Sequence, residues 1–194
     1  MFNIQNKAIL IISFLVLSFT GLQSANAQNG TSSTLETFND TESGISFQYP
    51  SDWEIASTDF VEQLLSSEDD TANAGPSPIQ LIHESLDGGY FMIQPEILPF
   101  SMSVEKYLEA SKRAVATDPS IQIDDSTVTP VSVGGLDGLK YDLTVDDGVS
   151  KVNQTQILLV KDSTGYVIGY GLGTSNPETE LAGINSIIDS IKVH

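Results

Sequence analysis

Cysteine is absent from the 194-residue sequence, and histidine occurs only twice. Without cysteine there can be no disulfide bond, no thiolate metal site and no cysteine nucleophile. His83 falls in a predicted strand, where an edge or hydrogen-bonded histidine is the ordinary interpretation, and two histidines are few for a transition-metal site. The HExxH, GxxxxGK(S/T) and strand-borne GxGxxG motifs are also missing. We therefore expect a protein that is not an enzyme and that has no cofactor unless calcium binds.

Basic residues are scarce as well. Lysine and arginine number 8 against 26 aspartates and glutamates, which gives a formal net charge of −18 at pH 7. Nucleic-acid binding needs clustered lysine and arginine to neutralise phosphates, so we expect none, and anionic lipid headgroups are repelled. A field of this sign attracts divalent cations or a basic partner, although a large negative charge also serves solubility alone.

A long apolar run is found only near the N-terminus. Lys7, the apolar run from Ala8 to Phe19 and the triplet Ala25-Asn26-Ala27 are typical of a secretory signal, which we assign to residues 1–27 with cleavage after Ala27. The run is shorter than the roughly 20 residues that span a bilayer, so no stable membrane span is expected after cleavage. An uncleaved signal anchor is the alternative. We expect a secreted or cell-surface, extracytoplasmic protein.

The remaining chain divides into a spacer and one domain. Residues 28–37 are rich in Ser, Thr, Asn and Gln and predict a flexible spacer, whereas residues 38–194 suffice for one domain with a sizeable core. Glycosylation-type sequons begin at Asn29, Asn39 and Asn153, and such short motifs also arise by chance.

The stretch from Gly44 to Ile55 holds the only tryptophan, Trp53. Ile45, Phe47 and Tyr49 alternate with polar residues, which predicts a strand with one buried face. Pro50-Ser51-Asp52 then predicts a tight turn, after which Trp53 and Ile55 resume the alternation. We interpret the stretch as a β-hairpin or β-corner at the edge of the core.

The other predicted elements alternate between strands and a few helices. Helices are predicted over residues 58–65 and 104–115, the second ended by Asp118-Pro119, and a closing helix begins at Asn176-Pro177. Strands are predicted over 79–84, 90–98, 121–133, 139–145, 152–160 and 166–172, with a loop at 66–78. The short, turn-like connections after residue 121 predict an antiparallel meander.

Two helices are needed to cover this sheet. The continuous apolar run Ile157 to Val160 predicts burial on both faces. The helix over 104–115 can cover one face, and the closing helix, whose apolar stripe we place at Leu181, Ile184, Ile188 and Ile191, can cover the other. Gly169 and Gly171 would let the closing helix approach closely. The predicted fold class is α+β, an α/β/α sandwich with a central, mostly antiparallel sheet.

Four stretches carry a resemblance to a known family. They are Gly44 to Trp53, Val131 to Tyr141, Gly165 to Tyr170 and Ile187 to Lys192. In them the chain, over about residues 38–194, resembles the PsbP family, which includes the extrinsic P subunit of the photosystem II oxygen-evolving complex and shares its fold with the Ran-binding Mog proteins.

The resemblance implies a non-catalytic extracytoplasmic domain that docks onto a larger assembly or helps to build one. Photosynthetic members dock partly through basic residues, which are few here, so no docking residue is carried over. Our leading hypothesis is a monomeric, exported PsbP-like domain that binds a protein or envelope assembly.

Carboxylates are the remaining candidates for chemistry, because calcium takes oxygen ligands from Asp, Glu and backbone carbonyls. Successive turns of a meander lie at alternating ends of the sheet. Asp137 and Asp162 should therefore share one end, with Asp146 and Asp147 at the other. Asp in a β-turn often serves the turn itself. An acidic calcium-binding protein is thus the alternative hypothesis, and a hydrolase that uses carboxylates alone is a third, which needs two acids facing one cleft.

Overall fold

The computed structural model describes residues 34–56, 79–83, 89–146, 148, 151–174 and 176–194. The predicted signal, the helix over 58–65, the loop over 66–78 and Asp147 lie outside the described residues. Within the described ranges, none of the helices has the length and apolarity that a membrane crossing requires.

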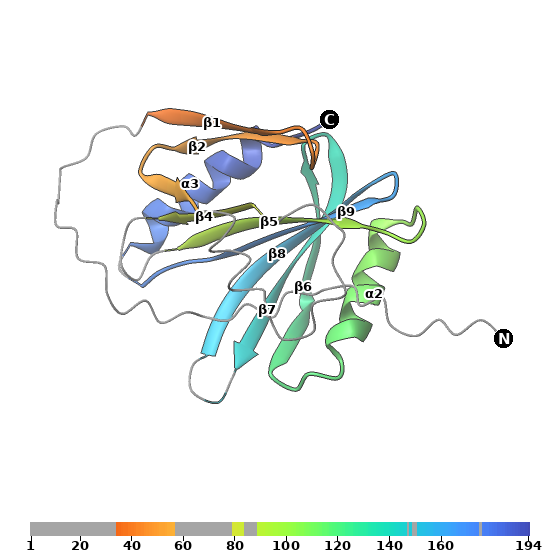
Figure 1. Cartoon of the computed structure of the whole chain (residues 1–194). Coiled ribbons are helices and arrows are strands. Elements are labelled where there is room, and N and C mark those ends of the chain that lie inside the picture. Colours follow the sequence, from red (N-terminus) through yellow and green to blue (C-terminus); the bar gives the residue numbers. More distant parts are fainter. Residues whose placement is uncertain (1–33, 57–78, 84–88, 147, 149–150, 175) are drawn as a thin grey trace.

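The strands form a large sheet and a small one, and all their pairings are antiparallel. The large sheet has the order β3 (Trp53–Ile55), β4 (Ile79–His83), β5 (Tyr90–Ile97), β9 (Thr164–Gly171), β8 (Lys151–Lys161), β7 (Leu136–Asp146) and β6 (Ile121–Val133) (Figure 1). The small sheet has the order β1 (Leu35–Asp40), β2 (Ile45–Pro50) and β10 (Lys192–Val193).

Each face of the large sheet has its own hydrophobic core. Helix α2 (Val104–Val115) covers one face, where Tyr107 and Leu108 pack with Tyr141 and Leu158. Helix α3 (Pro177–Ser190) lies with the small sheet on the other face (Figure 1). The predicted α/β/α sandwich with a mostly antiparallel central sheet is confirmed. The small sheet on the α3 side was not predicted.

The stretch around Pro50 joins the two sheets. β2 pairs with β1 and β10, whereas β3 pairs with β4. The hairpin interpretation is therefore wrong and the corner interpretation is confirmed. Ile45, Phe47, Tyr49 and Trp53 are buried as expected, but Ile55 is 39% exposed at the sheet edge and does not belong to the core. β1 begins at Leu35, three residues before the expected start of the domain.

The meander from β6 to β9 follows the prediction closely. Ile157 and Leu159 enter the core on the α3 side, while Leu158 enters the core on the α2 side. Gly134 and Gly135 have φ of 60° and 80°, which suits the tight turn between β6 and β7. Gly171 does not serve the approach of α3: an added Cβ would lie 2.6 Å from the ring of Tyr90 on the neighbouring strand.

Helix α3 begins at Asn176 and Pro177 as predicted, but its buried stripe differs from the expected one. Ile184 and Ile187 are fully buried, whereas Leu181 is 36% exposed. Glu180 takes a buried position at 1% exposure, where its Oε2 accepts a hydrogen bond of 2.6 Å from the Gly173 amide. Because Glu180 faces inward, Leu181 lies about 100° further around the helix, outside the buried face.

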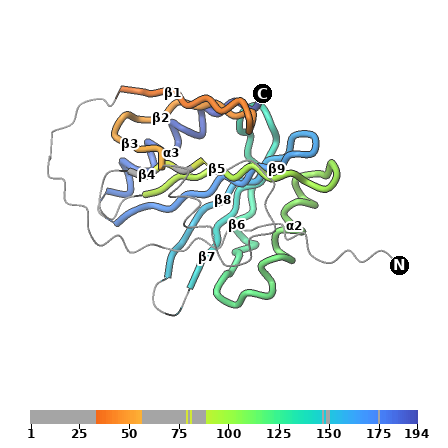
Figure 2. Tube along the Cα trace, in the orientation of Figure 1, coloured from red at the N-terminus to blue at the C-terminus, as the bar shows by residue number. Residues whose placement is uncertain are grey.

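The C-terminal end closes the small sheet. The His194 amide donates to the Gly44 carbonyl oxygen across 2.8 Å, which places this end beside the turn between β1 and β2 (Figure 2). Farther along β2, the Gln48 amide donates to Ser190 Oγ across 2.8 Å. The Ser190 hydroxyl thus takes the place that a longer β10 would occupy.

Candidate binding groove beside the sheet edge

The two ends of helix α2 follow from its local sequence. The Ser103 side chain accepts a hydrogen bond from the Lys106 amide, which satisfies one of the unpaired donors of the first turn. Glu105 lies in the positive first turn, and Lys112 and Arg113 lie in the negative last turn. The helix therefore spans the predicted residues, with a buried face of Tyr107, Leu108, Ser111 and Val115.

The first half of α2 is held against the sheet by a buried polar contact. Tyr107 Oη donates to Glu96 Oε2 of β5 across 2.5 Å. The helix can approach this closely because residue 165 on β9 is a glycine, whose added Cβ would lie 2.8 Å from Tyr107 Cζ. Burial raises the pKa of the Glu96 carboxyl, and the hydrogen bond from Tyr107 offsets part of that effect.

Further polar side chains lie on the same face of the sheet. Tyr141 Oη donates to Gln156 Oε1 across 2.6 Å, and both side chains are buried. Gln154, only 3% exposed, has neither side-chain polar atom hydrogen-bonded among the described residues. Burial of such groups without a hydrogen-bond partner costs free energy.

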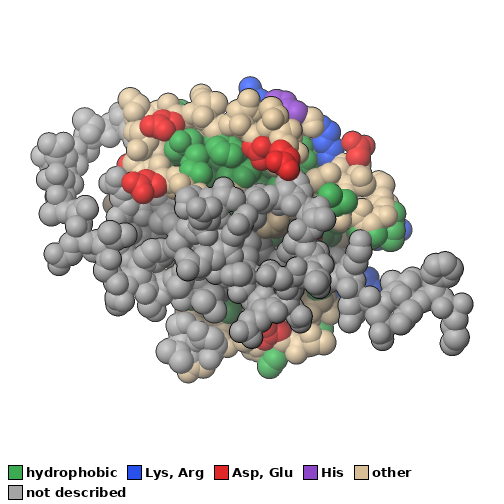
Figure 3. Space-filling view, viewed as in Figure 1, with side chains coloured by type: hydrophobic (Ala, Val, Ile, Leu, Met, Phe, Trp, Pro, Cys, Tyr) green, Lys and Arg blue, Asp and Glu red, His purple; other side chains and the backbone are tan. Residues whose placement is uncertain are grey.

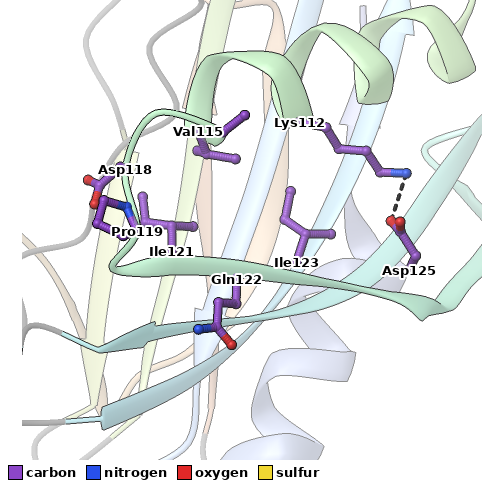
Figure 4. A pocket seen from close by; sticks show the side chains of 9 residues that line it. Lys112, Val115, Asp118, Pro119, Ile121, Gln122, Ile123 and Asp125 are labelled. Atoms are coloured by element: carbon purple, nitrogen blue, oxygen red, sulfur yellow. Dashed lines mark ion pairs between the residues drawn. The ribbon is translucent and has the colours of Figure 1, made fainter.

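The second half of α2 leaves a groove between the helix and β6. The helix packs on β7 and β8, so the outermost strand β6 lies at its side (Figure 1). The apolar part of the groove lining consists of Val115, the C-cap residue Ala116, and Ile121 and Ile123 of β6, and Asp118-Pro119 closes one end (Figure 4). Its volume is about 350 Å³. This volume lies at the lower end of the roughly 300 to 1,000 Å³ that ligand and cofactor pockets span.

Charged groups line the two ends of the groove. Lys112 Nζ lies 2.7 Å from Asp125 Oδ1 and 3.3 Å from Glu109 Oε1. The hydrogen bond to Asp125 raises the pKa of Lys112. At the other end, the Ser120 hydroxyl and amide both donate to Asp118 and lower the pKa of that carboxyl. Among the described residues that line the groove, the one cation is therefore already paired, and the groove has a negative rim.

The opposite face of the same strand edge is also acidic. Asp124 of β6 and Asp142 of β7 are direct cross-strand partners, so their side chains share a face. Ser126 donates to Asp124, and Thr155 donates to Asp142 across 2.8 Å. Like charges directly opposite each other are unfavourable, and a cation added beside them would relieve that repulsion.

The calcium candidates remain at two ends of the meander. Asp137 lies opposite Ser132 at the β6–β7 turn, and Asp162 lies in the β8–β9 turn at the same end of the sheet, with φ of 55°. Asp146 lies at the other end and accepts a hydrogen bond from the Gly148 amide. Within the part of the chain that the structure describes, no three His, Asp or Glu side chains are grouped as metal ligands.

One pairing was missed by the sequence reasoning. Ser46 Oγ lies 2.8 Å from His194 Nε2 at the outer surface of the small sheet. The distance suits a nucleophile and a base, but the pair is exposed, and it joins His194 to β2. The sequence signal that could have indicated this pairing was the alternation of apolar and polar residues near residue 192, which was too short to predict a strand.

The sequence reasoning also missed the groove, although it placed the apolar groove residues of β6 in a strand. Ile121 and Ile123 alternate with Gln122 in a predicted strand, and the helix before them was located correctly. Nothing in the periodicity shows which strands of a sheet a helix covers. The acidic surface was foreseeable from composition, and Figure 3 shows carboxylates at several places on the described surface of one face.

Comparisons with known proteins agree with this architecture. A family model described as "PsbP-like protein" matches residues 8–193. No curated protein matches the chain significantly. Among solved structures, cyanobacterial PsbP (CyanoP) of Synechocystis is similar with a TM-score of 0.55 and 13% identity, over 88% of this chain and 98% of that one.

Two further structures show more distant likeness. A Bacteroides thetaiotaomicron protein matches with a TM-score of 0.52 and 11% identity, over 81% of this chain. The match spans about half of that protein, 48% of its length. LpqN of Mycobacterium tuberculosis, described as involved in cell envelope biogenesis, matches at 12% identity with a TM-score of 0.40, over 81% of this chain and 90% of LpqN. At these identities the likeness concerns the fold.

Proposed function

The chain belongs to the PsbP-like protein family, and from this premise we propose that it is an exported, non-enzymatic module that binds a protein or an envelope assembly. The observation that carries the proposal is the groove between α2 and β6, which offers a partly apolar lining at the edge strand of the large sheet. Export is supported by the signal-like residues 1–27, and a protein-binding role is supported by the size and openness of the groove.

A cross-linking experiment on the native envelope tests this proposal. The full chain is expressed in its own cell with a C-terminal affinity tag, cross-linked in place and purified under denaturing conditions. We expect one or a few specific cross-linked proteins that a tagged, exported acidic protein of unrelated fold does not recover. Equal recovery by both proteins would contradict a specific binding role. Fractionation of the same cells tests export, because a purely cytoplasmic protein would contradict it.

Calcium binding is a second candidate function. It is favoured by the placement of Asp137 and Asp162 at one end of the sheet and by the large acidic excess. Titration calorimetry of the exported protein with calcium is the test, with the Asp137→Asn and Asp146→Asn variants reporting on the two ends. No heat at millimolar calcium would remove this candidate, and heat that neither variant changes would exclude the assigned residues.

A further inference from the structure

We propose that β6 accepts an extended segment of a partner protein as an additional strand, and that this segment alternates apolar and basic side chains. The inference rests on the proposed binding function and specifies its partner. It is built on three properties of the same edge: the position of β6 in the sheet, the groove on one face and the carboxylates on the other.

The first property is the edge itself. β6 is the last strand in the order of the large sheet, and it pairs with β7 on one side. Its pairing is regular over Ile121 to Asp124, and the register then shifts before Thr129. Pro130 follows and lacks an amide donor. Because the Asp146 amide donates to the Ser120 carbonyl oxygen, residues 121 and 123 point their backbone groups away from β7. The Ile121 amide already donates to the Asp118 carbonyl oxygen across 3.3 Å, so the Ile121 carbonyl oxygen and the backbone groups of Ile123 are what this edge offers to a short added strand.

The second property is the groove on the α2 face. Side chains of a strand alternate between the two faces, so Ile121 and Ile123 point toward α2 while Gln122 points away (Figure 4). An added strand would place every second side chain beside these isoleucines, below Val115 and Ala116. The space of about 350 Å³ is bordered by apolar side chains and by the polar side chains of Lys112, Gln122 and Asp125, and it is open because α2 covers β7 and β8. Those positions of the partner should therefore be apolar.

The third property is the charge on the opposite face. The alternate side chains of an added strand would point to the face that carries Asp124 and Asp142. These two carboxylates oppose each other across β6 and β7, and both are exposed. Lysine or arginine at the partner's alternate positions would face them. The negative groove rim and the net charge of −18 also attract a positively charged partner over long range.

A defined peptide pair tests the proposal with the exported protein. The probe is a fluorescein-labelled, end-capped peptide of sequence Lys-Val-Lys-Val-Lys, and its counterpart is Glu-Val-Glu-Val-Glu. Anisotropy at low ionic strength should show saturable binding of the basic peptide, weakened by salt, and no comparable binding of the acidic one. A third peptide with proline in place of the central lysine loses an amide and should bind more weakly.

Matched variants locate the site. Ala116 is an exposed lining residue, so Ala116→Phe fills the groove from its rim, whereas Ala114→Phe adds the same side chain to an exposed position outside the groove. We expect Ala116→Phe to weaken peptide binding about tenfold, because one apolar side chain of the peptide can no longer be buried. Ala114→Phe should leave binding unchanged. Asp124→Asn should weaken binding about threefold, and Asp189→Asn on α3 should change it little.

Several results would overturn the proposal. These are absence of saturable binding by the basic peptide, equal binding of the acidic peptide, equal weakening by Ala114→Phe and Ala116→Phe, or equal effects of the two aspartate substitutions. Circular dichroism shows whether each variant is folded. If Ala116→Phe does not fold, the binding of the basic peptide to Asp124→Asn decides whether the proposal holds. A partner cross-linked equally well to the Ala116→Phe variant would refute this inference while leaving the proposed function intact.

Discussion

The hydroxyl of Tyr107 on α2 and the carboxylate of Glu96 on β5 are 2.5 Å apart in the core between the helix and the sheet. The contact joins the first turn of the helix to a strand on the far side of β9. The other end of the helix forms the wall of the groove beside β6. The contact therefore holds the helix at the end opposite the groove.

Removal of the Tyr107 hydroxyl is expected to destabilise the protein. Tyr107→Phe keeps the ring but leaves Glu96 Oε2 without its donor, and Glu96 Oε1 already has no hydrogen bond among the described residues. We expect a loss of about 1–3 kcal/mol in the free energy of unfolding, measured by urea denaturation. Tyr49→Phe is the matched control, because Tyr49 donates to the exposed Glu36 at 2.9 Å, and its loss should be smaller. An equal or smaller effect at Tyr107 would contradict the role of this contact.

Glu96 should make stability depend on pH. Its pKa is raised by burial, so the folded protein holds this proton more tightly than the unfolded chain does. The stabilisation from Glu96 is therefore fully present below the unfolded pKa of about 4.3 and is lost as the pH rises through the folded pKa. Glu96→Gln removes this dependence.

Urea denaturation of both proteins at several pH values measures the effect. The unfolding free energy of the wild type relative to Glu96→Gln should decrease between acid pH and neutrality, because the glutamine stays uncharged and can still accept from Tyr107. A difference that is constant with pH, or that increases, would show that the carboxyl does not titrate as inferred.

Residue 165 must be a glycine for α2 to pack as it does. An alanine Cβ there would lie 2.8 Å from Tyr107 Cζ, inside normal contact distance, and the ring is fully buried. We expect Gly165→Ala to cost about 1–3 kcal/mol of unfolding free energy, which is typical of overpacking. In the Tyr107→Leu background the same substitution should cost clearly less, because the ring that it meets is gone. Additive losses in the double variant would contradict a direct clash.

The sequence was sufficient to predict the layers of this fold, but not the strand pairings that connect them. Periodicity located α2 and the strands from β6 to β9, since their apolar faces repeat over many residues. β10 has only two residues, Lys192 and Val193, which is too short for any periodic signal. The partner of β2 was likewise out of reach, because strand pairing depends on contacts between residues such as Ser46 and Lys192 that are far apart in the chain.

The candidate groove was likewise predictable only in part. Its apolar residues were recognisable as members of a helix and a strand, but the space between them depends on how α2 packs on the sheet, where Tyr107 contacts Glu96 of β5 and Gly165 of β9. The buried position of Glu180 could not be predicted either, because an acid in a first turn ordinarily serves the helix dipole in solvent. Such positions are decided by tertiary contacts between particular side chains.

Ser190 should be important for the edge of the small sheet. Its Oγ accepts from the Gln48 amide at 2.8 Å, and its hydroxyl lies within hydrogen-bond distance of the Gln48 and Ile187 carbonyl oxygens. Ser190→Ala would leave the Gln48 amide without this partner next to the end of α3. The expected cost is about 1 kcal/mol, and the Gln48 amide should exchange faster with solvent.

Hydrogen exchange distinguishes this local effect from general destabilisation. In Ser190→Ala, faster exchange should be confined to β2 and the last turn of α3, while the amides of β8 keep their protection apart from the change in global stability. Ser190→Thr retains the hydroxyl and should preserve protection at Gln48. Unchanged exchange at Gln48 in the alanine variant would mean that water replaces the serine hydroxyl at no cost, and that the α3–β2 join depends on the apolar contacts of Ile184 and Ile187 instead.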